Sequence, residues 1–103
     1  MIKLSILYPY AEGKRFDMDY YCEKHMPKAQ EMLKGAVKKM SVEKGICGAA
    51  PGSAPEYIAV GNLYFESLEI FNEVFPPIVP QIGQDIPNFT DTEPVLMISE
   101  VII

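Results

Sequence analysis

Residues 2–9 read IKLSILYP, and their side chains alternate between the two faces of an extended chain. The apolar side chains on one face are Ile2, Leu4, Ile6 and Tyr8. An alternation of this kind is typical of a β-strand that packs one face against a core. Because Pro9 and Gly13 follow, we expect the strand to end there.

A helix is expected next, from Asp17 to about Lys34. Asp17 has a suitable side chain for an N-cap, and Gly35 follows the last turn as a stop signal. The residues at helical spacing on the apolar side are Met18, Tyr21, Cys22, His25, Ala29, Met32 and Leu33. The Pro27 ring clashes with the backbone carbonyl four residues earlier, so we predict a kink or a break at residues 25–27.

Three further strands and a second helix complete the pattern. The strands are expected over residues 37–46, 57–65 and 95–103. Ser67 can cap the second helix, which Pro76 and Pro77 divide into two short pieces. The order βαββαβ predicts a ferredoxin-like α+β fold, in which a four-stranded antiparallel sheet carries two helices on one face. We expect a single domain over residues 1–103, a length usual for one domain.

Both faces of this predicted sheet are apolar. The last strand carries apolar side chains on each face: Val95, Met97, Val101 and Ile103 on one, and Leu96, Ile98 and Ile102 on the other. Two helices can cover only one face, whereas an antiparallel sheet with one face in water alternates apolar and polar residues. A second copy of the sheet is the simplest cover, so we predict a homodimer whose two sheets close face to face into a barrel.

The composition argues against several classes of protein. A net charge of −5 disfavours non-specific binding of nucleic acid. No apolar run reaches about 20 residues and the N-terminal stretch does not fit a signal peptide, so we expect no membrane segment and a cytoplasmic location. The two cysteines, Cys22 and Cys47, are too few for a disulfide scaffold or a zinc site, and we expect both to be buried thiols.

Two motifs point to a known family. Residues 16–27 read FDMDYYCEKHMP, and residues 85–90 read DIPNFT, followed by EP at 93–94 and ISE at 98–100. On these motifs the whole chain resembles the EthD family of the dimeric α+β-barrel superfamily. The resemblance implies the same ferredoxin-like dimer. It also implies a part in the oxidative degradation of a hydrophobic organic compound, because the family is named for an accessory role in the breakdown of a tert-butyl ether.

Three positions depart from the family pattern. Phe89 stands where tyrosine is common, Met97 where glutamine is common, and Ile78 where a second histidine is often found. A mechanism that requires a pair of histidines would therefore lack one partner in this chain.

His25, the only histidine, is the first candidate for chemistry. It lies on the apolar side of the helix where Pro27 interrupts it, and Tyr21 lies one turn before it. An imidazole facing a barrel interior can act as a general acid or base, and a nearby phenol can exchange a proton with a carbonyl or enol. We therefore name His25 and Tyr21 as candidate catalytic residues. The alternative is a histidine that only hydrogen-bonds the interrupted turn, and its charge stays open because burial and the helix end act in opposite directions.

Four more polar side chains are candidate contacts for a substrate. They are Tyr8 at the end of the first strand, Tyr20 on the helix, and Asn62 and Tyr64 on the strand over residues 57–65. The alternative for each tyrosine is a place in the core with its hydroxyl at the edge.

The sequence has no glycine-rich phosphate loop, no nucleophile elbow and no Cys-x-x-Cys pair, so we predict neither a metal nor another cofactor. The leading hypothesis is a cofactor-independent enzyme, or an accessory protein, that acts on a small hydrophobic organic compound. An oxidoreductase is favoured over a cyclase or an isomerase. The alternatives are a non-catalytic carrier dimer that serves a partner oxygenase and a haem-handling protein with His25 as axial ligand.

Overall fold

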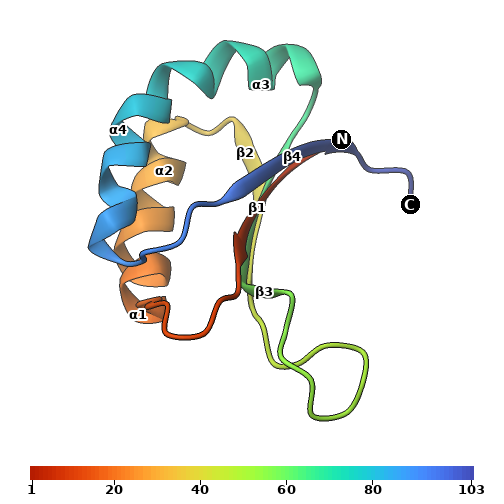
Figure 1. Cartoon of the computed structure of the whole chain (residues 1–103). Coiled ribbons are helices and arrows are strands. Elements are labelled where there is room, and N and C mark those ends of the chain that lie inside the picture. Colours follow the sequence, from red (N-terminus) through yellow and green to blue (C-terminus); the bar gives the residue numbers. More distant parts are fainter.

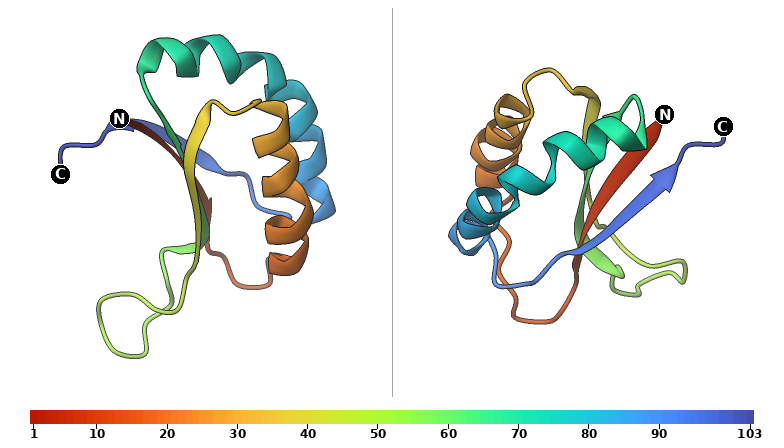
Figure 2. Two further views of the ribbon diagram at one scale, coloured as in Figure 1. Left: turned by 180° about the vertical axis from the view of Figure 1, so that it is seen from behind. Right: turned by 90° about the horizontal axis from the view of Figure 1, so that it is seen from above.

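Four antiparallel strands form one sheet in the order β2-β3-β1-β4 (Figure 1). The computed structural model describes residues 1–103. The strands are β1 (Ile2–Pro9), β2 (Val37–Lys44), β3 (Tyr57–Phe65) and β4 (Val95–Glu100). All helices lie on one side of the sheet, as the views from behind and from above show (Figure 2). The predicted ferredoxin-like α+β fold is confirmed.

The first helical segment continues through Pro27 instead of breaking there. It consists of α1 (Met18–Tyr20), the π-helical segment η1 (Tyr21–His25) and α2 (Met26–Met32). Met26 keeps helical dihedral angles, and its N–H donates to the Tyr21 carbonyl five residues earlier. The wider π turn shifts the hydrogen bonds by one residue just before Pro27, which has no N–H to donate. This wide turn takes the place of the expected kink or break.

The second helical segment is divided at its prolines, as predicted. Its parts are α3 (Leu68–Val74), η2 (Pro76–Ile78), α4 (Val79–Asp85) and η3 (Ile86–Asn88). Both predicted N-caps are confirmed, because Asp17 accepts from the Tyr20 N–H and Ser67 accepts from the Ile70 N–H. No helix of this chain combines the length and the hydropathy that a membrane span requires.

Two strands are shorter than expected, and both cysteines are exposed. β4 ends at Glu100 because this residue pairs with Ile2, the first residue of β1, and little partner strand remains beyond it. β2 ends at Lys44, which leaves Cys47 in the long connection to β3. Cys22 lies in η1 with its side chain directed to solvent. The expectation of two buried thiols is therefore wrong.

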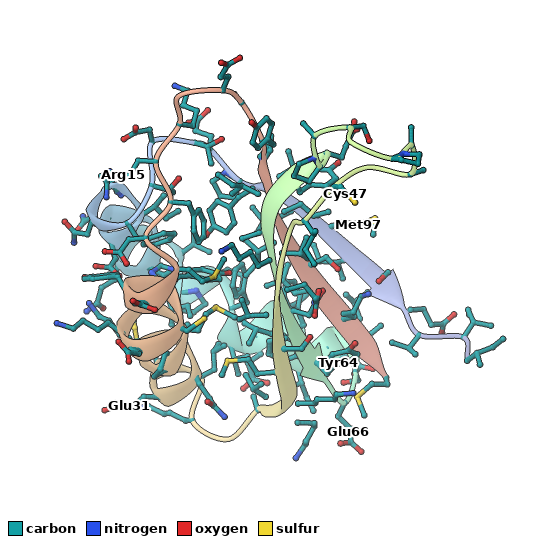
Figure 3. The ribbon with its side chains drawn as sticks, turned by 90° about the horizontal axis from the view of Figure 1, so that it is seen from below. Arg15, Glu31, Cys47, Tyr64, Glu66 and Met97 are labelled. Carbon is teal, nitrogen blue, oxygen red and sulfur yellow. The ribbon has the colours of Figure 1, made fainter.

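The hydrophobic core lies between the sheet and the helices. Its fully buried side chains include Leu4, Tyr8, Tyr21, Met26, Leu33, Leu63, Phe65 and Phe89. The opposite face of the sheet carries no helix. Figure 3 shows Tyr64 and Met97 projecting on that side, away from the helices. The single chain thus leaves one face of its sheet uncovered.

Candidate functional site

A buried histidine–carboxylate pair is the most unusual chemical feature of the core. His25 Nδ1 lies 2.8 Å from Asp85 Oδ2, and the two residues are 3 % and 8 % exposed. They are 60 residues apart in sequence, His25 at the end of η1 and Asp85 at the end of α4. Buried charged groups are costly unless they are paired and hydrogen-bonded, so this arrangement needs its partners.

Three donors surround the carboxylate of Asp85. The Tyr20 hydroxyl donates to Oδ1 at 2.7 Å, and the Asn88 side-chain amide donates to the same oxygen at 2.9 Å. Burial by itself would raise the pKa of Asp85. The hydrogen bonds from Asn88, Tyr20 and His25 together outweigh it and lower that pKa to about 2.

The ionised carboxylate fixes the tautomer of His25. A carboxylate only accepts hydrogen bonds, so Nδ1 carries the hydrogen and the neutral ring keeps its lone pair on Nε2. Nε2 makes no hydrogen bond within the chain. Burial lowers the pKa of His25, and the bond to Asp85 opposes this only in part. At neutral pH the imidazole is therefore uncharged and has a free basic nitrogen.

Contacts from the N-terminal loop hold the Asp85 segment against the first helix. Phe16 forms an isolated β-bridge with Thr90. The Asp17 N–H donates to the Phe89 carbonyl at 2.7 Å, and the Thr90 hydroxyl donates to the Arg15 carbonyl at 2.7 Å. The Phe89 ring lies over His25, with the two ring centroids 4.5 Å apart. The motifs FDMDYYCEKHMP and DIPNFT therefore meet in space around His25.

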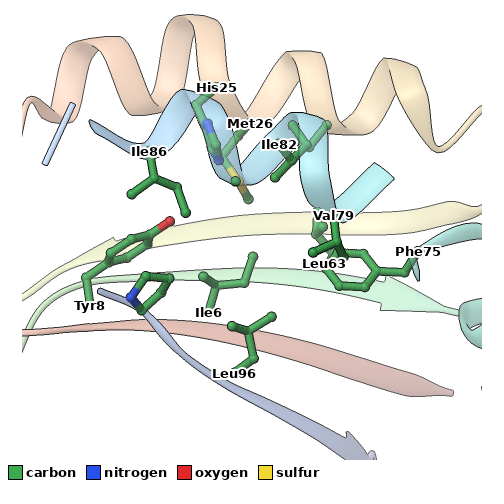
Figure 4. Close-up of a pocket in the computed structure, with 13 residues that line it drawn as sticks. Ile6, Tyr8, His25, Met26, Leu63, Phe75, Val79, Ile82, Ile86 and Leu96 are labelled. Carbon is green, nitrogen blue, oxygen red and sulfur yellow. The ribbon is translucent and has the colours of Figure 1, made fainter. Parts of the chain in front are cut away.

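An apolar cavity of about 100 Å³ lies next to the pair, between the sheet and the helices (Figure 4). Its walls come from β1, β3, β4, η1, α2 and the second helical segment, and include Ile6, Leu63, Phe75, Ile82, Ile86 and Leu96. His25 and Tyr8 bring polar atoms to this lining, and Figure 4 shows both near the same end. The cavity reaches the surface between α4 and β4, where Val79 and Leu96 are each nearly half exposed.

The two candidate tyrosines closest to His25 have different positions. Tyr8 lines the cavity, and burial raises the pKa of its phenol, which therefore stays protonated and can donate. Tyr21 stacks on the His25 ring, with the centroids 5.6 Å apart, but it does not line the cavity. Its hydroxyl is buried against Gly61 and has no hydrogen-bond partner. Burial raises the pKa of Tyr21 as well.

The other three candidates lie farther from the cavity. Tyr20 holds Asp85 from the rim of the site. Asn62 and Tyr64 lie on the face of the sheet opposite to His25, where the Asn62 amide bonds the side chains of Ser5, Ser41 and Glu43. The structure thus brings Tyr8, Tyr20 and Tyr21 together around His25, and leaves Asn62 and Tyr64 on the uncovered face.

Sequence reasoning missed Asp85, which it treated only as part of a family motif. Taken alone, the sequence shows one histidine and gives no sign of which distant carboxylate lies beside it. The sequence signal that could have pointed to Asp85 was the second motif, DIPNFT. This motif begins with Asp85, which is also the last residue of α4. Only the packing of α4 against η1 shows that this carboxylate faces His25.

The lining residues also bear on the haem hypothesis. A cavity of about 100 Å³ is much smaller than the roughly 300–1,000 Å³ of sites for drug-sized ligands. A porphyrin is at least as large as such ligands, so these residues do not fit a haem.

A ferredoxin-like α+β protein with an apolar cavity under its helices is the class that these observations define. Within this class the sequence matches the EthD domain over residues 12–93, and the chain belongs to the EthD family. It is 42% identical to an EthD-like protein from Ralstonia eutropha JMP134, with a TM-score of 0.94 over 99% of this chain and 92% of that one.

More distant structures share the fold. An ethyl tert-butyl ether D (EthD) family protein from Bacillus halodurans C-125 is 22% identical, with a TM-score of 0.73 over 99% of both chains. HapK from Hahella chejuensis is 12% identical, with a TM-score of 0.60 over 99% of this chain and 93% of that one. No protein of curated function matches the sequence significantly.

Proposed function

We propose that this chain is a cofactor-independent acid–base enzyme for a small hydrophobic organic compound, with His25 as the proton-transfer group. The observation that carries the proposal is the 2.8 Å His25–Asp85 pair beside an otherwise apolar cavity. Nε2 makes no hydrogen bond within the chain, so it is available to a bound compound. The lowered pKa keeps the imidazole unprotonated near pH 7, which is the form that accepts a proton.

The proton transfer follows from this geometry. His25 Nε2 takes a proton from a C–H or O–H group of the bound compound, while Nδ1–H stays bonded to Asp85. The resulting imidazolium is then paired with a carboxylate that is already ionised. The Tyr8 hydroxyl, at the same end of the cavity, donates to the oxygen on which negative charge develops. The proton returns from Nε2 to the product, so no redox cofactor enters this step.

In this proposal Tyr21 and Tyr20 position the pair. Tyr21 packs against the imidazole ring and fixes its orientation. Tyr20 donates to Asp85 and keeps the carboxylate ionised. A direct proton transfer by Tyr21 would require its hydroxyl to reach the cavity, which it does not line.

The size and polarity of the cavity support a compact hydrophobic compound. A dry cavity of about 150 Å³ holds benzene, so a cavity of about 100 Å³ favours a compound no larger than one small ring or one branched alkyl group. The Bacillus halodurans relative is named for ethyl tert-butyl ether, which is compact and hydrophobic. We place the proton transfer in the oxidative degradation of a compound of this kind, in the cytoplasm, where a partner oxygenase would supply the oxidation.

Cyclohexanone is a suitable probe, because it is one small apolar ring with a single oxygen and acidic α-hydrogens. In D₂O the protein should accelerate exchange of these hydrogens, followed by proton NMR. His25→Ala should reduce the accelerated rate by roughly 10²- to 10⁴-fold. The control is Gln30→Ala, an exposed change on α2 outside the cavity lining.

Binding is followed in the same sample, because a chain with one histidine gives one set of imidazole signals. A shift of the His25 signal without accelerated exchange would indicate the alternative function, a non-catalytic carrier. No shift at saturating cyclohexanone would contradict the proposed site itself.

We further propose that the protein acts as a homodimer whose two sheets pair through their uncovered faces. The support is the exposure of apolar side chains on this side, among them Val95 and Met97, which are both about half exposed. Exposed apolar side chains that gather on one face often mark a protein–protein interface. Size-exclusion chromatography with light scattering should give twice the 11.5 kDa chain mass at micromolar concentration. A monomer under these conditions would contradict the dimer and leave the acid–base site intact.

A further inference from the structure

Gly83 differs from the other six glycines of the chain. Gly13, Gly35 and Gly52 have positive φ angles, which glycine adopts more easily than any other residue. At the remaining three, Gly45, Gly48 and Gly61, a Cβ atom would collide with a neighbouring group. Gly83 has no positive φ, and a Cβ atom there would meet nothing within 4 Å. Neither the backbone nor the packing therefore requires a glycine at position 83.

A glycine at this position weakens its helix. Gly83 lies within α4 (Val79–Asp85), where alanine would be more favourable because it loses less backbone freedom on folding. The helix is only seven residues long and already contains Pro80. Because Gly83 lowers helix stability and no backbone angle requires it, we expect the reason to lie in the space beside it.

The space next to Gly83 is the apolar cavity. Gly83 is one of its lining residues. It lies four residues after Val79 and three before Ile86, so the three share one side of the helix, and all line the cavity. Pro94, just before β4, and Leu96, the second residue of β4, complete the lining near the surface. A Cβ atom at position 83 would meet no neighbouring atom, and the open space that Gly83 lines is this cavity.

We propose that Gly83 determines the size of the compound that the cavity accepts. The cavity of about 100 Å³ is small enough that one added side chain would remove a large part of it. The polar end, at His25 and Tyr8, would hold the oxygen of the compound, and Gly83 leaves room for its apolar substituents. The compound is accordingly a compact hydrophobic molecule with one oxygen-bearing end and a branched or cyclic apolar end. This inference rests on the proposed function, because it assigns a selectivity residue to the same site.

The first test is thermal stability and needs no ligand. Gly83→Ala should raise the melting temperature by about 4–8 °C, since it favours the helix and meets no neighbour. A decrease would show that the space beside residue 83 is filled, and would overturn the inference without affecting the site at His25.

The second test uses a graded set of probes: cyclobutanone, cyclopentanone and cyclohexanone. These ketones keep the oxygen constant and enlarge the apolar end within the size of one small ring. Binding is measured from the single His25 imidazole signal in the wild type, Gly83→Ala, Gly83→Leu and Gln84→Leu. Gln84 is the matched control because it is the next residue on α4, is exposed and does not line the cavity.

The expected result is a loss of affinity that grows with probe size. Gly83→Leu should weaken binding of cyclohexanone at least tenfold more than that of cyclobutanone, with Gly83→Ala between it and the wild type. Gln84→Leu should bind all three ketones as the wild type does. Equal affinities in the wild type and both Gly83 variants would overturn the role of Gly83 and leave the proposed function standing. Ketones that leave the His25 signal of the wild type unchanged would instead overturn the proposed site, and this inference with it.

Discussion

Neighbouring residues of β3 point to opposite faces of the sheet, and the two faces differ in polarity. On β3, Leu63 points to the helices and is 1 % exposed, while Asn62 points to the other side. The covered face encloses an apolar cavity with the His25–Asp85 pair at one end. The uncovered face has a polar centre, in which Asn62 bonds Ser5, Ser41 and Glu43, surrounded by apolar side chains.

This difference indicates that catalysis and association use different faces of the sheet. On the covered face, Nε2 of His25 and the Tyr21 hydroxyl make no hydrogen bond within the chain. Polar groups on the uncovered face satisfy one another and leave no free donor or acceptor of that kind in Asn62. We therefore assign reactivity to the covered face and association to the uncovered one. Each prediction below sharpens or breaks this division.

The largest effect is expected from truncation on the covered face. Leu63→Ala should lower the free energy of unfolding by about 2–5 kcal/mol, because it opens a cavity in a packed core. Met97→Ala, on the uncovered face, should cost less than about 0.5 kcal/mol within one chain. Urea unfolding at several protein concentrations separates the two, since loss at Met97 should appear only in association. Equal losses in a monomeric form would break the comparison.

A smaller effect is expected where β3 meets the first helix. A Cβ atom at position 61 would collide with the Tyr21 hydroxyl, so Gly61→Ala should destabilise the protein by about 1–3 kcal/mol. Tyr21→Phe removes that hydroxyl, which has no hydrogen-bond partner, and should be close to neutral by itself. The double variant should therefore recover most of the loss in thermal unfolding. Failure to recover it would mean that another group occupies the space at Gly61.

The free energy of unfolding should depend on the ionisation of Asp85 at acid pH. Its pKa is about 2 in the folded protein and 3.8 in the unfolded reference, so the unfolded state binds the proton more readily. The stabilisation, on the order of 2 kcal/mol, is complete above about pH 4 and is lost as the pH falls towards 2.

Chemical unfolding between pH 2 and 5 measures this contribution. Asp85→Asn should flatten the profile over this range, and Tyr20→Phe should reduce its slope by removing one of the three donors. An unchanged profile in Asp85→Asn would show that the carboxylate is not held by these hydrogen bonds.

The smallest effect is expected at the edge of the uncovered face. The Lys39 ammonium lies 5.3 Å from the centroid of the Tyr64 ring, a cation–π contact worth about 0.5–1 kcal/mol at an exposed site. Lys39→Gln should lower stability by no more than this, and Lys39→Arg should retain it. A loss of several kcal/mol, measured by urea unfolding, would mean that a second copy of the chain buries this contact.

Most of the fold could be predicted from local signals. The alternation of residues 2–9 and the apolar spacing after Asp17 gave the correct element types and order, because these patterns record which side of each element is buried. The predictions of the strand ends and of the turn before Pro27 were less accurate. β4 ends where its partner strand ends, and η1 widens to accommodate Pro27, so both depend on neighbours and not on composition.

The candidate site was predictable in part. His25 and the tyrosines near it lie on one helix or on the adjoining strand, and helical spacing brings Tyr21 to His25 without any tertiary information. Asn62 and Tyr64 share a strand with cavity residues but alternate away from them. Their placement on the uncovered face follows from the twofold period of a strand, once it is known which face carries the helices.

The sequence by itself determined the element order, the helix caps, the family and the position of the only imidazole. These properties depend on residues close together along the chain, whose spacing fixes their side of a helix or strand. The tertiary structure alone decided the partner of that imidazole and the place of Gly83 beside the cavity. Asp85 is 60 residues from His25, and no local rule states which distant helix end will pack against η1. Once they meet in a buried site, the carboxylate sets the tautomer and the pKa, and with them the chemistry available to the protein.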